Sequence, residues 1–273
     1  MQRINDPNTN RMKTTFLVVF TMLLTTQIVV GQTATIDHYK ANTLIIQNDT
    51  LPYRILAPKQ LDATKKYPLV LFLHGSGERG RDNQLQLVHG ASFFASDSIQ
   101  NNYEAFVVFP QCDNGEQWSN YEYDGEGKDR EFFYSINSPP HSNQQNLMAL
   151  VDYLQTNYPI DSARLYVGGL SMGGMGTLEL LKRNPNTFAA AFAICGGAHT
   201  KAARKIKKTP VWLFHGEDDT VVPARYSIEL YKALLKKKAQ TKLTIYPKTG
   251  HDSWTATFKE PGLLDWLFSH SKE

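Results

Sequence analysis

A serine set among glycines constrains this chain most. Residues 168–174 read Gly-Gly-Leu-Ser-Met-Gly-Gly and directly follow a β-type run at 163–167. A strand that breaks into G-x-S-x-G and then into a helical pattern is the signature of a sharp strand-to-helix turn. Such a turn requires strained dihedrals and close backbone contacts, which Gly169 and Gly173 tolerate because they lack a Cβ atom. The pattern predicts that this turn presents the hydroxyl of Ser171 for nucleophilic attack.

Apolar runs and helical patterns alternate along the rest of the chain. Strands are predicted at 43–46, 51–56, 67–73, 105–109, 163–167, 188–195, 210–215 and 242–246. Helices are predicted at 142–158, 172–182, 224–238 and 262–269. This alternation predicts an α/β fold, with a mostly parallel central sheet and helices on both faces. In such sheets functional residues gather at the carboxyl ends of the strands.

A serine hydroxyl is a poor nucleophile at neutral pH, so it needs a base and a carboxylate that orients the base. In folds of this kind the order along the chain is Ser, then Asp or Glu, then His. The strand at 210–215 runs into His-Gly-Glu-Asp-Asp, and the last strand is followed by Gly-His. We therefore expect His251 to be the general base and Asp219 to be its carboxylate partner, with Asp218 as the alternative.

Stabilising a tetrahedral oxyanion takes two converging backbone amides. We expect the first from Met172, which follows the nucleophile. The second should come from the loop His-Gly-Ser-Gly-Glu-Arg-Gly at 74–80, whose glycines let the backbone approach a substrate carbonyl. We assign it to Ser76, with Gly75 as the alternative donor and as a substrate-contacting residue. The loop lacks the G-x-x-x-x-G-K-[ST] pattern of a phosphate-binding loop.

Together these motifs resemble the α/β-hydrolase superfamily. The resemblance covers residues 50–270 and rests on Leu73-His-Gly-Ser-Gly77, Gly169-Leu-Ser-Met-Gly173, His215-Gly-Glu-Asp-Asp219 with Val222-Pro223, and Gly250-His251. Further stretches are similar to secreted esterases related to feruloyl esterases and polyhydroxybutyrate depolymerases, often labelled predicted peptidases or phospholipases: Pro110-Gln-Cys112, Trp118 and Ile194-Cys-Gly-Gly197. The resemblance implies hydrolysis of carboxylic esters without a cofactor, on an α/β-hydrolase fold with no large cap domain.

The segment 113–140 is expected to cover the site as a loop. It is rich in aromatic residues, and we expect Trp118 to contact the substrate because aromatic rings suit a sugar or aryl group. The alternative is an ordinary surface loop that is packed by its own aromatic residues. Its acidic residues could also bind calcium, although their spacing matches no EF-hand loop.

The first residues are typical of a secretory signal peptide. Basic residues precede an apolar stretch at 16–30, and the small residues that follow suit cleavage before Gln32. A retained membrane anchor is the alternative, but the stretch is short and rich in threonine for a spanning helix. We therefore expect a signal peptide at 1–31, a catalytic domain at 32–273, and a secreted or periplasmic protein with no membrane partner.

Charge and cysteine content narrow the possible partners. The net charge is +3, and the basic clusters at 201–208 and 236–238 accompany no nucleic-acid-binding module, so we expect no nucleic-acid partner. Cys112 and Cys195 could pair in an exported protein or stay as two buried thiols. Neither lies in a pattern with zinc-ligand spacing, so no metal is expected.

These features favour a secreted serine esterase that acts through an acyl-enzyme, on feruloyl or acetyl esters of plant polysaccharides. Two alternatives remain open. A serine peptidase of prolyl-oligopeptidase type would use the same residues, although 273 residues leave no room for a propeller domain. A catalytically silent carbohydrate-binding relative would not need Ser171, Asp219 and His251.

Overall fold

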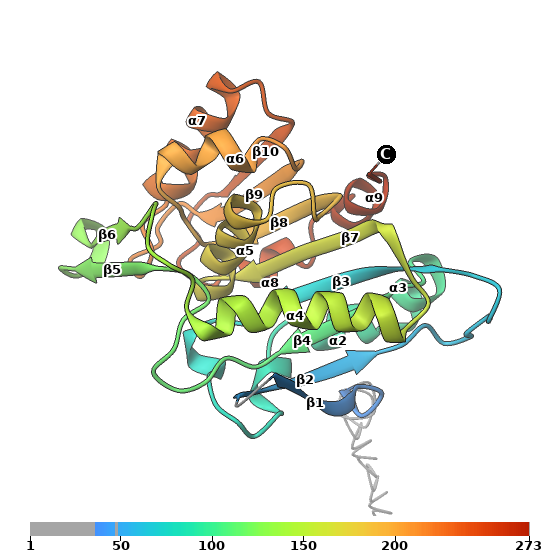
Figure 1. Ribbon diagram of the computed structural model, residues 1–273. Helices are drawn as coiled ribbons and strands as arrows, with labels where there is room; N and C mark the ends of the chain where they lie inside the picture. Colours follow the sequence, from blue (N-terminus) through green and yellow to red (C-terminus); the bar gives the residue numbers. More distant parts are fainter. Residues whose placement is uncertain (1–35, 47–48, 273) are drawn as a thin grey trace, which may run out of the picture. The chain divides into compact units, whose positions relative to one another are not determined.

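A mixed eight-stranded sheet organises the residues that the computed structural model describes, 36–46 and 49–272 (Figure 1). Two strand pairs, β1–β2 and β2–β4, are antiparallel, and the other five pairs are parallel. The strands in spatial order are β1 (Lys40–Ile46), β2 (Asp49–Leu56), β4 (Phe106–Pro110), β3 (Tyr67–Leu73), β7 (Ile160–Leu170), β8 (Ala190–Ile194), β9 (Val211–Gly216) and β10 (Thr241–Tyr246).

The central strands are apolar along their whole length because both of their faces are covered. Every residue of β3, β4, β8 and β9 is buried, as expected for parallel strands between two helical layers. The edge strand β1 instead alternates between exposed and half-buried positions. The mostly parallel sheet and the α/β class predicted from the sequence are therefore confirmed.

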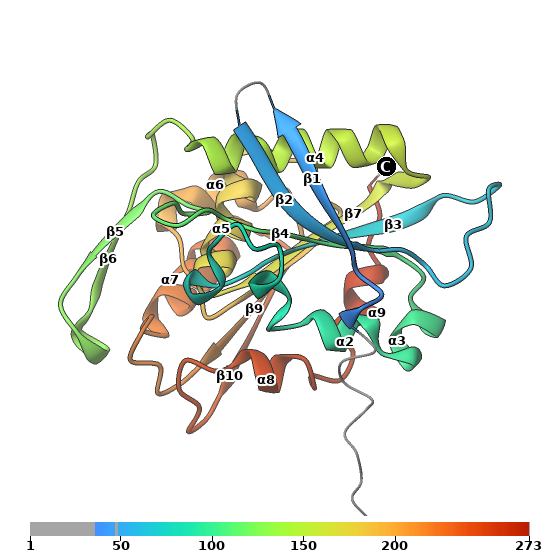
Figure 2. The same cartoon turned by 90° about the horizontal axis from the view of Figure 1, so that it is seen from below.

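Helices cover both faces of the sheet (Figures 1 and 2). One hydrophobic cluster packs one face against α4 (Ser142–Asn157), α5 (Met172–Arg183), α6 (Ala203–Ile206) and α7 (Arg225–Lys236). The second cluster packs the opposite face against α2 (Ala91–Ala95), α3 (Asp97–Asn102), α8 (Trp254–Thr257) and α9 (Leu263–Phe268). Short 3₁₀ turns complete the chain at η1 (Ser76–Glu78), η2 (Leu85–Leu87), η3 (Gly127–Asp129) and η4 (Thr200–Ala202).

A two-stranded hairpin, β5 (Tyr121–Asp124) with β6 (Glu131–Tyr134), replaces the irregular loop expected over this segment. Figures 1 and 2 show that it projects from the end of the sheet where the parallel strands finish. Tyr121 pairs with Tyr134, and Tyr123 pairs with Phe132, so four aromatic rings share one face. Apart from this hairpin, no large cap domain interrupts residues 36–46 and 49–272.

The described residues all fall within one compact unit, Gly31–Glu273. The expected signal peptide at 1–31 lies outside the described residues. Among the helices that are described, none combines the length and apolar character that crossing a bilayer would require.

Candidate active site

Ser171 occupies a sharp turn between β7 and α5. Its φ and ψ are 53° and −117°, a combination that L-residues rarely adopt and that costs about 1–3 kcal/mol. The turn is crowded: a Cβ atom added to Gly173 would lie 1.9 Å from Leu73 O, and one added to Gly169 would lie 2.5 Å from Gly173 O. Only glycine fits these two positions, so the glycines of the motif allow β3, β7 and α5 to converge beneath the serine.

The turn brings Ser171 against a histidine that follows β10. His251 Nε2 lies 2.9 Å from Ser171 Oγ, and His251 Nδ1 lies 2.7 Å from Asp219 Oδ2, in the loop after β9. Since the carboxylate can only accept, Nδ1 donates to it and Nε2 is left to accept from the serine hydroxyl. Residues separated by 80 and 32 positions thus meet at the carboxyl ends of β7, β9 and β10.

Asp219, and not its neighbour Asp218, faces the histidine. Asp219 Oδ1 accepts hydrogen bonds from the backbone N–H groups of Val221 and Val222, at 2.8 and 2.9 Å, which fixes the carboxylate from behind. The side chain of Asp218 points outward and forms an exposed ion pair with Lys128 Nζ at 2.8 Å. The adjacent carboxylates therefore have different surroundings, because the turn buries one of them.

The environment of Asp219 keeps it ionised. Burial alone would raise its pKa, but hydrogen bonds from His215 and His251, together with the charge on His251, outweigh burial and hold the pKa of Asp219 well below its usual range. Asp219 therefore remains a negatively charged acceptor for the Nδ1–H group of His251.

His215 is a supporting residue that the sequence analysis did not single out. It is fully buried, and its Nε2 lies 2.7 Å from Val222 O and 3.2 Å from Asp219 Oδ2. Its Nδ1 lies 2.7 Å from Ser227 Oγ, whose own hydroxyl hydrogen is donated to Gly196 O at 2.9 Å. The ring therefore faces acceptors at both nitrogens and connects the loop after β9 to α7.

The two backbone amides expected to stabilise an oxyanion both stand at the start of a helix. Met172 is the first residue of α5 and Ser76 is the first residue of η1, so neither N–H has an acceptor within its own helix. Gly75, the alternative donor, borders the nucleophile, since a Cβ atom added to it would be 3.7 Å from Ser171 Cβ. Both Gly75 and Ser76 thus belong to the turn that faces Ser171.

The expectation that Trp118 contacts the substrate is wrong. Trp118 has no exposed surface; its indole N–H donates to His74 O at 3.2 Å, and its side chain packs where Gly176 on α5 leaves space. The residue instead supports the loop after β3 from below. An aromatic residue in a polar segment can serve either purpose, and the sequence does not distinguish them.

The two cysteines are separate buried thiols and do not form a disulfide. Burial raises the pKa of both thiols, which disfavours the thiolate forms. Within residues 36–46 and 49–272, one group of potential metal ligands was found, in which Cys195, Asp219 and His251 place ligand atoms within 4.8 Å of one another. Asp219 and His251 are already hydrogen-bonded to each other, so this group is a poor metal site.

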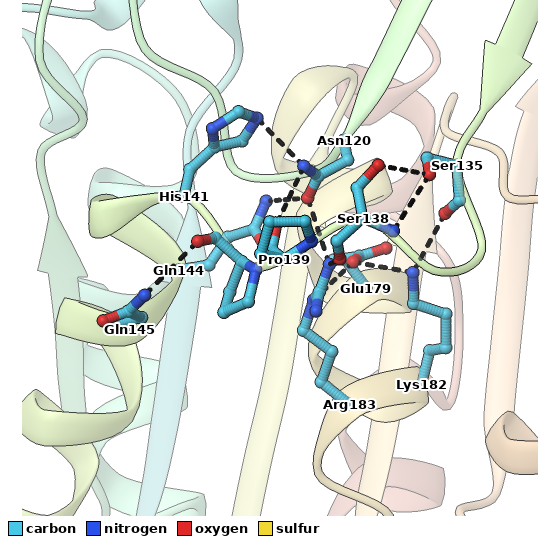
Figure 3. Close-up of polar contacts among 11 residues, drawn as sticks. Asn120, Ser135, Ser138, Pro139, His141, Gln144, Gln145, Glu179, Lys182 and Arg183 are labelled. Atoms are coloured by element: carbon cyan, nitrogen blue, oxygen red, sulfur yellow. Dashed lines mark hydrogen bonds and ion pairs between the residues drawn. The ribbon is translucent and has the colours of Figure 1, made fainter.

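A polar network fastens the foot of the hairpin to α5, the helix that begins at the serine turn (Figure 3). The Glu179 carboxylate, 6% exposed, accepts from Lys182 Nζ at 2.7 Å and from Arg183 Nε at 2.6 Å. Lys182 also donates to Ser135 O at 3.1 Å, and Arg183 donates to Ser138 O at 2.8 Å. The chain that leaves β6 is therefore held by the cations of α5.

The other end of the hairpin is fastened to the loop that carries Asp219. Arg130 donates to Val221 O at 3.0 Å, next to the exposed pair of Lys128 with Asp218. The Arg225 side chain donates to Lys128 O at 2.6 Å and also contacts Arg130 O. The hairpin thus forms a fixed wall at the carboxyl end of the sheet.

The comparison with known families agrees with this geometry. Residues 60–260 match the profile of the phospholipase/carboxylesterase family, which is most of the chain. The chain belongs to the phospholipase/carboxylesterase family. This membership confirms the resemblance to α/β-hydrolases and the expected class, the carboxylic ester hydrolases.

Individual members of the wider group are similar over part of their length. A bifunctional acetylxylan esterase/xylanase of Neocallimastix patriciarum is 28% identical over 69% of this chain and 24% of the relative. A poly(3-hydroxyalkanoate) depolymerase C of Paucimonas lemoignei is 28% identical over 56% of this chain and 33% of the relative. The chain thus spans a third or less of the length of these curated relatives.

Solved structures show the same fold. A thermostable esterase is 35% identical to this chain, with a TM-score of 0.79. The match covers 88% of this chain and 64% of the esterase. A ferulic acid esterase is 17% identical, with a TM-score of 0.63 over 85% of this chain and 98% of the other. At 17% identity the second likeness concerns the fold alone.

Proposed function

We propose that this chain is a serine esterase in which Ser171, His251 and Asp219 form the catalytic triad. The observation that carries the proposal is the unbroken contact from Ser171 Oγ through both nitrogens of His251 to Asp219 Oδ2, at 2.9 and 2.7 Å. These are the distances at which a histidine can take a proton from serine while a carboxylate fixes its tautomer.

The reaction proceeds in two acyl transfers. Ser171 Oγ attacks the ester carbonyl while its proton passes to His251 Nε2, and the carbonyl oxygen becomes an oxyanion. The N–H of Met172 and that of Ser76, or of Gly75 in its place, donate to this oxyanion. His251 then gives the proton to the leaving alcohol. Water attacks the acyl-enzyme by the same route and releases the acid and free serine.

The substrate and the cellular location belong to the same proposal. We assign acetyl or feruloyl esters of polysaccharides as substrates, supported by the acetylxylan esterase activity in the name of a relative that is 28% identical. The basic and apolar pattern of the first residues supports secretion, with residues 1–31 removed and 32–273 forming the catalytic domain.

The experiment measures initial rates of the protein that lacks residues 1–31, with Ser171→Ala alongside. The substrates are p-nitrophenyl acetate, p-nitrophenyl butyrate, methyl ferulate, acetylated xylan and a peptidyl aminomethylcoumarin. Ester turnover should fall by about 10⁴ to 10⁶ in Ser171→Ala, provided that circular dichroism shows an unchanged fold. Near-normal ester turnover by the folded variant would refute the mechanism. Serine-dependent cleavage of the peptide alone would favour a peptidase.

A further inference from the structure

Glu78, on η1, is a largely buried carboxylate without a hydrogen-bond donor. Its side chain is 14% exposed, and no N–H or O–H of the described residues donates to its carboxylate. His89 Nε2 lies 3.7 Å from the carboxylate, which is too long for a hydrogen bond. Neither carboxylate oxygen is among the solvent-inaccessible polar atoms, so a hydroxyl from outside the protein can reach them and supply the donor that the described residues do not.

This carboxylate lies beside the nucleophile. A Cβ atom built on Gly75 would be 3.0 Å from Glu78 Oε2 and 3.7 Å from Ser171 Cβ, so the carboxylate and the serine flank the same point. The catalytic steps proposed above do not use Glu78. A negative charge close to the oxyanion would hinder the reaction unless a bound group offsets it.

Two aromatic side chains, His89 and Trp254, lie between Glu78 and the catalytic histidine. The ring of His89 lies 5.0 Å from that of Trp254, and Trp254 packs edge-on against His251 with 5.5 Å between ring centroids. Trp254 is only partly buried. We call Glu78, His89 and Trp254 the rim. Because His251 must reach the leaving oxygen to protonate it, a group packed against His251 borders the alcohol part of an ester.

The charges around Glu78 favour a neutral donor over a cation. His89 is adjacent, and Arg79 is the next residue in the chain. Burial is the main influence on two nearby groups, lowering the pKa of His74 and raising that of Cys112. The charge on Arg79 is close enough to act on both groups as well, in the direction that lowers their pKa. An ammonium group would be repelled by Arg79, whereas a hydroxyl would donate to the carboxylate without this cost. A carboxylate beside an indole ring also suits a polyol, since the ring packs against C–H groups while the oxygen binds a hydroxyl.

From these contacts we propose that the rim is a subsite for a hydroxyl-bearing alcohol, in which Glu78 accepts a hydrogen bond from a hydroxyl next to the ester. The inference rests on the proposed esterase function and adds to it the residue that would recognise the alcohol part of the ester. Glu78 determines specificity here and takes no part in proton transfer.

The test compares two esters that differ in one hydroxyl: the monoacetate of trans-1,2-cyclohexanediol and cyclohexyl acetate. The measured quantity is the ratio of kcat/KM for the first ester to that for the second. Glu78→Ala should lower this ratio at least about ten-fold, as expected for a hydrogen bond to a charged group, and Glu78→Gln should lower it less. The matched control is Glu104→Ala, an exposed carboxylate that precedes β4 at the opposite end of the sheet.

A binding measurement separates this inference from the proposed function. In a Ser171→Ala background, Trp fluorescence reports the Kd of the diol monoacetate, and Glu78→Ala should raise it at least about ten-fold. Glu78-dependent binding without turnover would support the rim and refute the esterase. An unchanged ratio and Kd in folded Glu78→Ala would overturn the rim. A larger Glu78 effect on acetylcholine relative to 3,3-dimethylbutyl acetate would overturn it in favour of an ammonium site.

Discussion

His215 Nε2 lies 3.2 Å from Asp219 Oδ2, the same oxygen that faces His251. The carboxylate is thereby held between two imidazole rings, one from the strand end that precedes it and one from the loop after β10. The inner ring is fully buried and also contacts Val222 O and Ser227 Oγ. It thus fixes the Asp219 carboxylate and joins its loop to α7.

Replacing His215 by Asn should weaken the fold. The shorter amide cannot reach every acceptor that the ring contacts, so buried polar atoms lose partners at about 1–3 kcal/mol each. We expect the free energy of unfolding in urea to drop by about 2–4 kcal/mol. His38→Asn, on an exposed side chain, is the control and should stay within about 0.5 kcal/mol. Equal urea midpoints for both variants would contradict this role.

The two adjacent aspartates should respond differently to substitution. Asp219→Asn keeps the shape but favours the wrong tautomer of His251, so kcat on p-nitrophenyl acetate should fall by about 10⁴. Asp218→Asn removes only an exposed ion pair with Lys128 and should change kcat less than about ten-fold. Comparable losses in the two variants would show that the carboxylate has been assigned incorrectly.

His74 should make stability depend on pH. Burial lowers the pKa of His74 to about 4, whereas the unfolded chain protonates it near its ordinary value of 6.5. Below about pH 6.5 the unfolded state binds a proton at His74 that the folded state does not. The contribution of His74 to stability is therefore fully present above that pH and declines as the pH falls towards 4.

The decline attributable to His74 should reach roughly 3 kcal/mol. The free energy of unfolding of wild type and His74→Gln is measured in denaturant at intervals from pH 7.5 to 4. The difference between the two curves gives the contribution of His74, because the carboxylates titrate in both proteins. The wild-type curve should be steeper in this window. Parallel curves would mean that His74 is protonated equally in both states.

Glu179→Gln should loosen the hairpin. The neutral side chain leaves Lys182 and Arg183 without their shared carboxylate in a mostly buried place, which should cost about 3–5 kcal/mol. Limited proteolysis should then cut residues 121–134 sooner than in wild type. Glu131→Gln, an exposed change on the hairpin itself, is the control. Unchanged proteolysis and unfolding would indicate that α5 does not hold the hairpin.

The sequence predicts the sheet well, because most of its strands are continuous apolar runs. It also predicts the turn at Ser171, because only glycine fits the crowded positions 169 and 173. Every strand expected between residues 43 and 246 is present, and Ser171, Asp219 and His251 are brought together as expected from their order. The helices and strands that the sequence analysis did not predict have no recognisable pattern of apolar residues. Helices α2, α3 and α8 are 4–6 residues long and too short to show a period, and β5 and β6 are four-residue strands within an otherwise irregular segment.

The surroundings of the site depend on long-range contacts that the sequence does not encode locally. Trp118 resembles any aromatic residue of a polar segment, and only the space above Gly176 makes it a core residue. Glu78 is likewise one acidic residue in a glycine-rich loop. Its lack of a donor follows from where His89 and the turn at Ser171 lie in three dimensions.

The backbone at position 171 suits glycine better than serine. With φ at 53°, the residue stays in this conformation because β3, β7 and α5 surround it, and the rest of the fold bears the cost. Selection for stability alone would favour replacing the hydroxyl-bearing residue, so retaining serine here opposes that pressure. A lineage released from the need to cleave its substrate would be expected to drift towards glycine at this position and to become more heat-resistant as it did so.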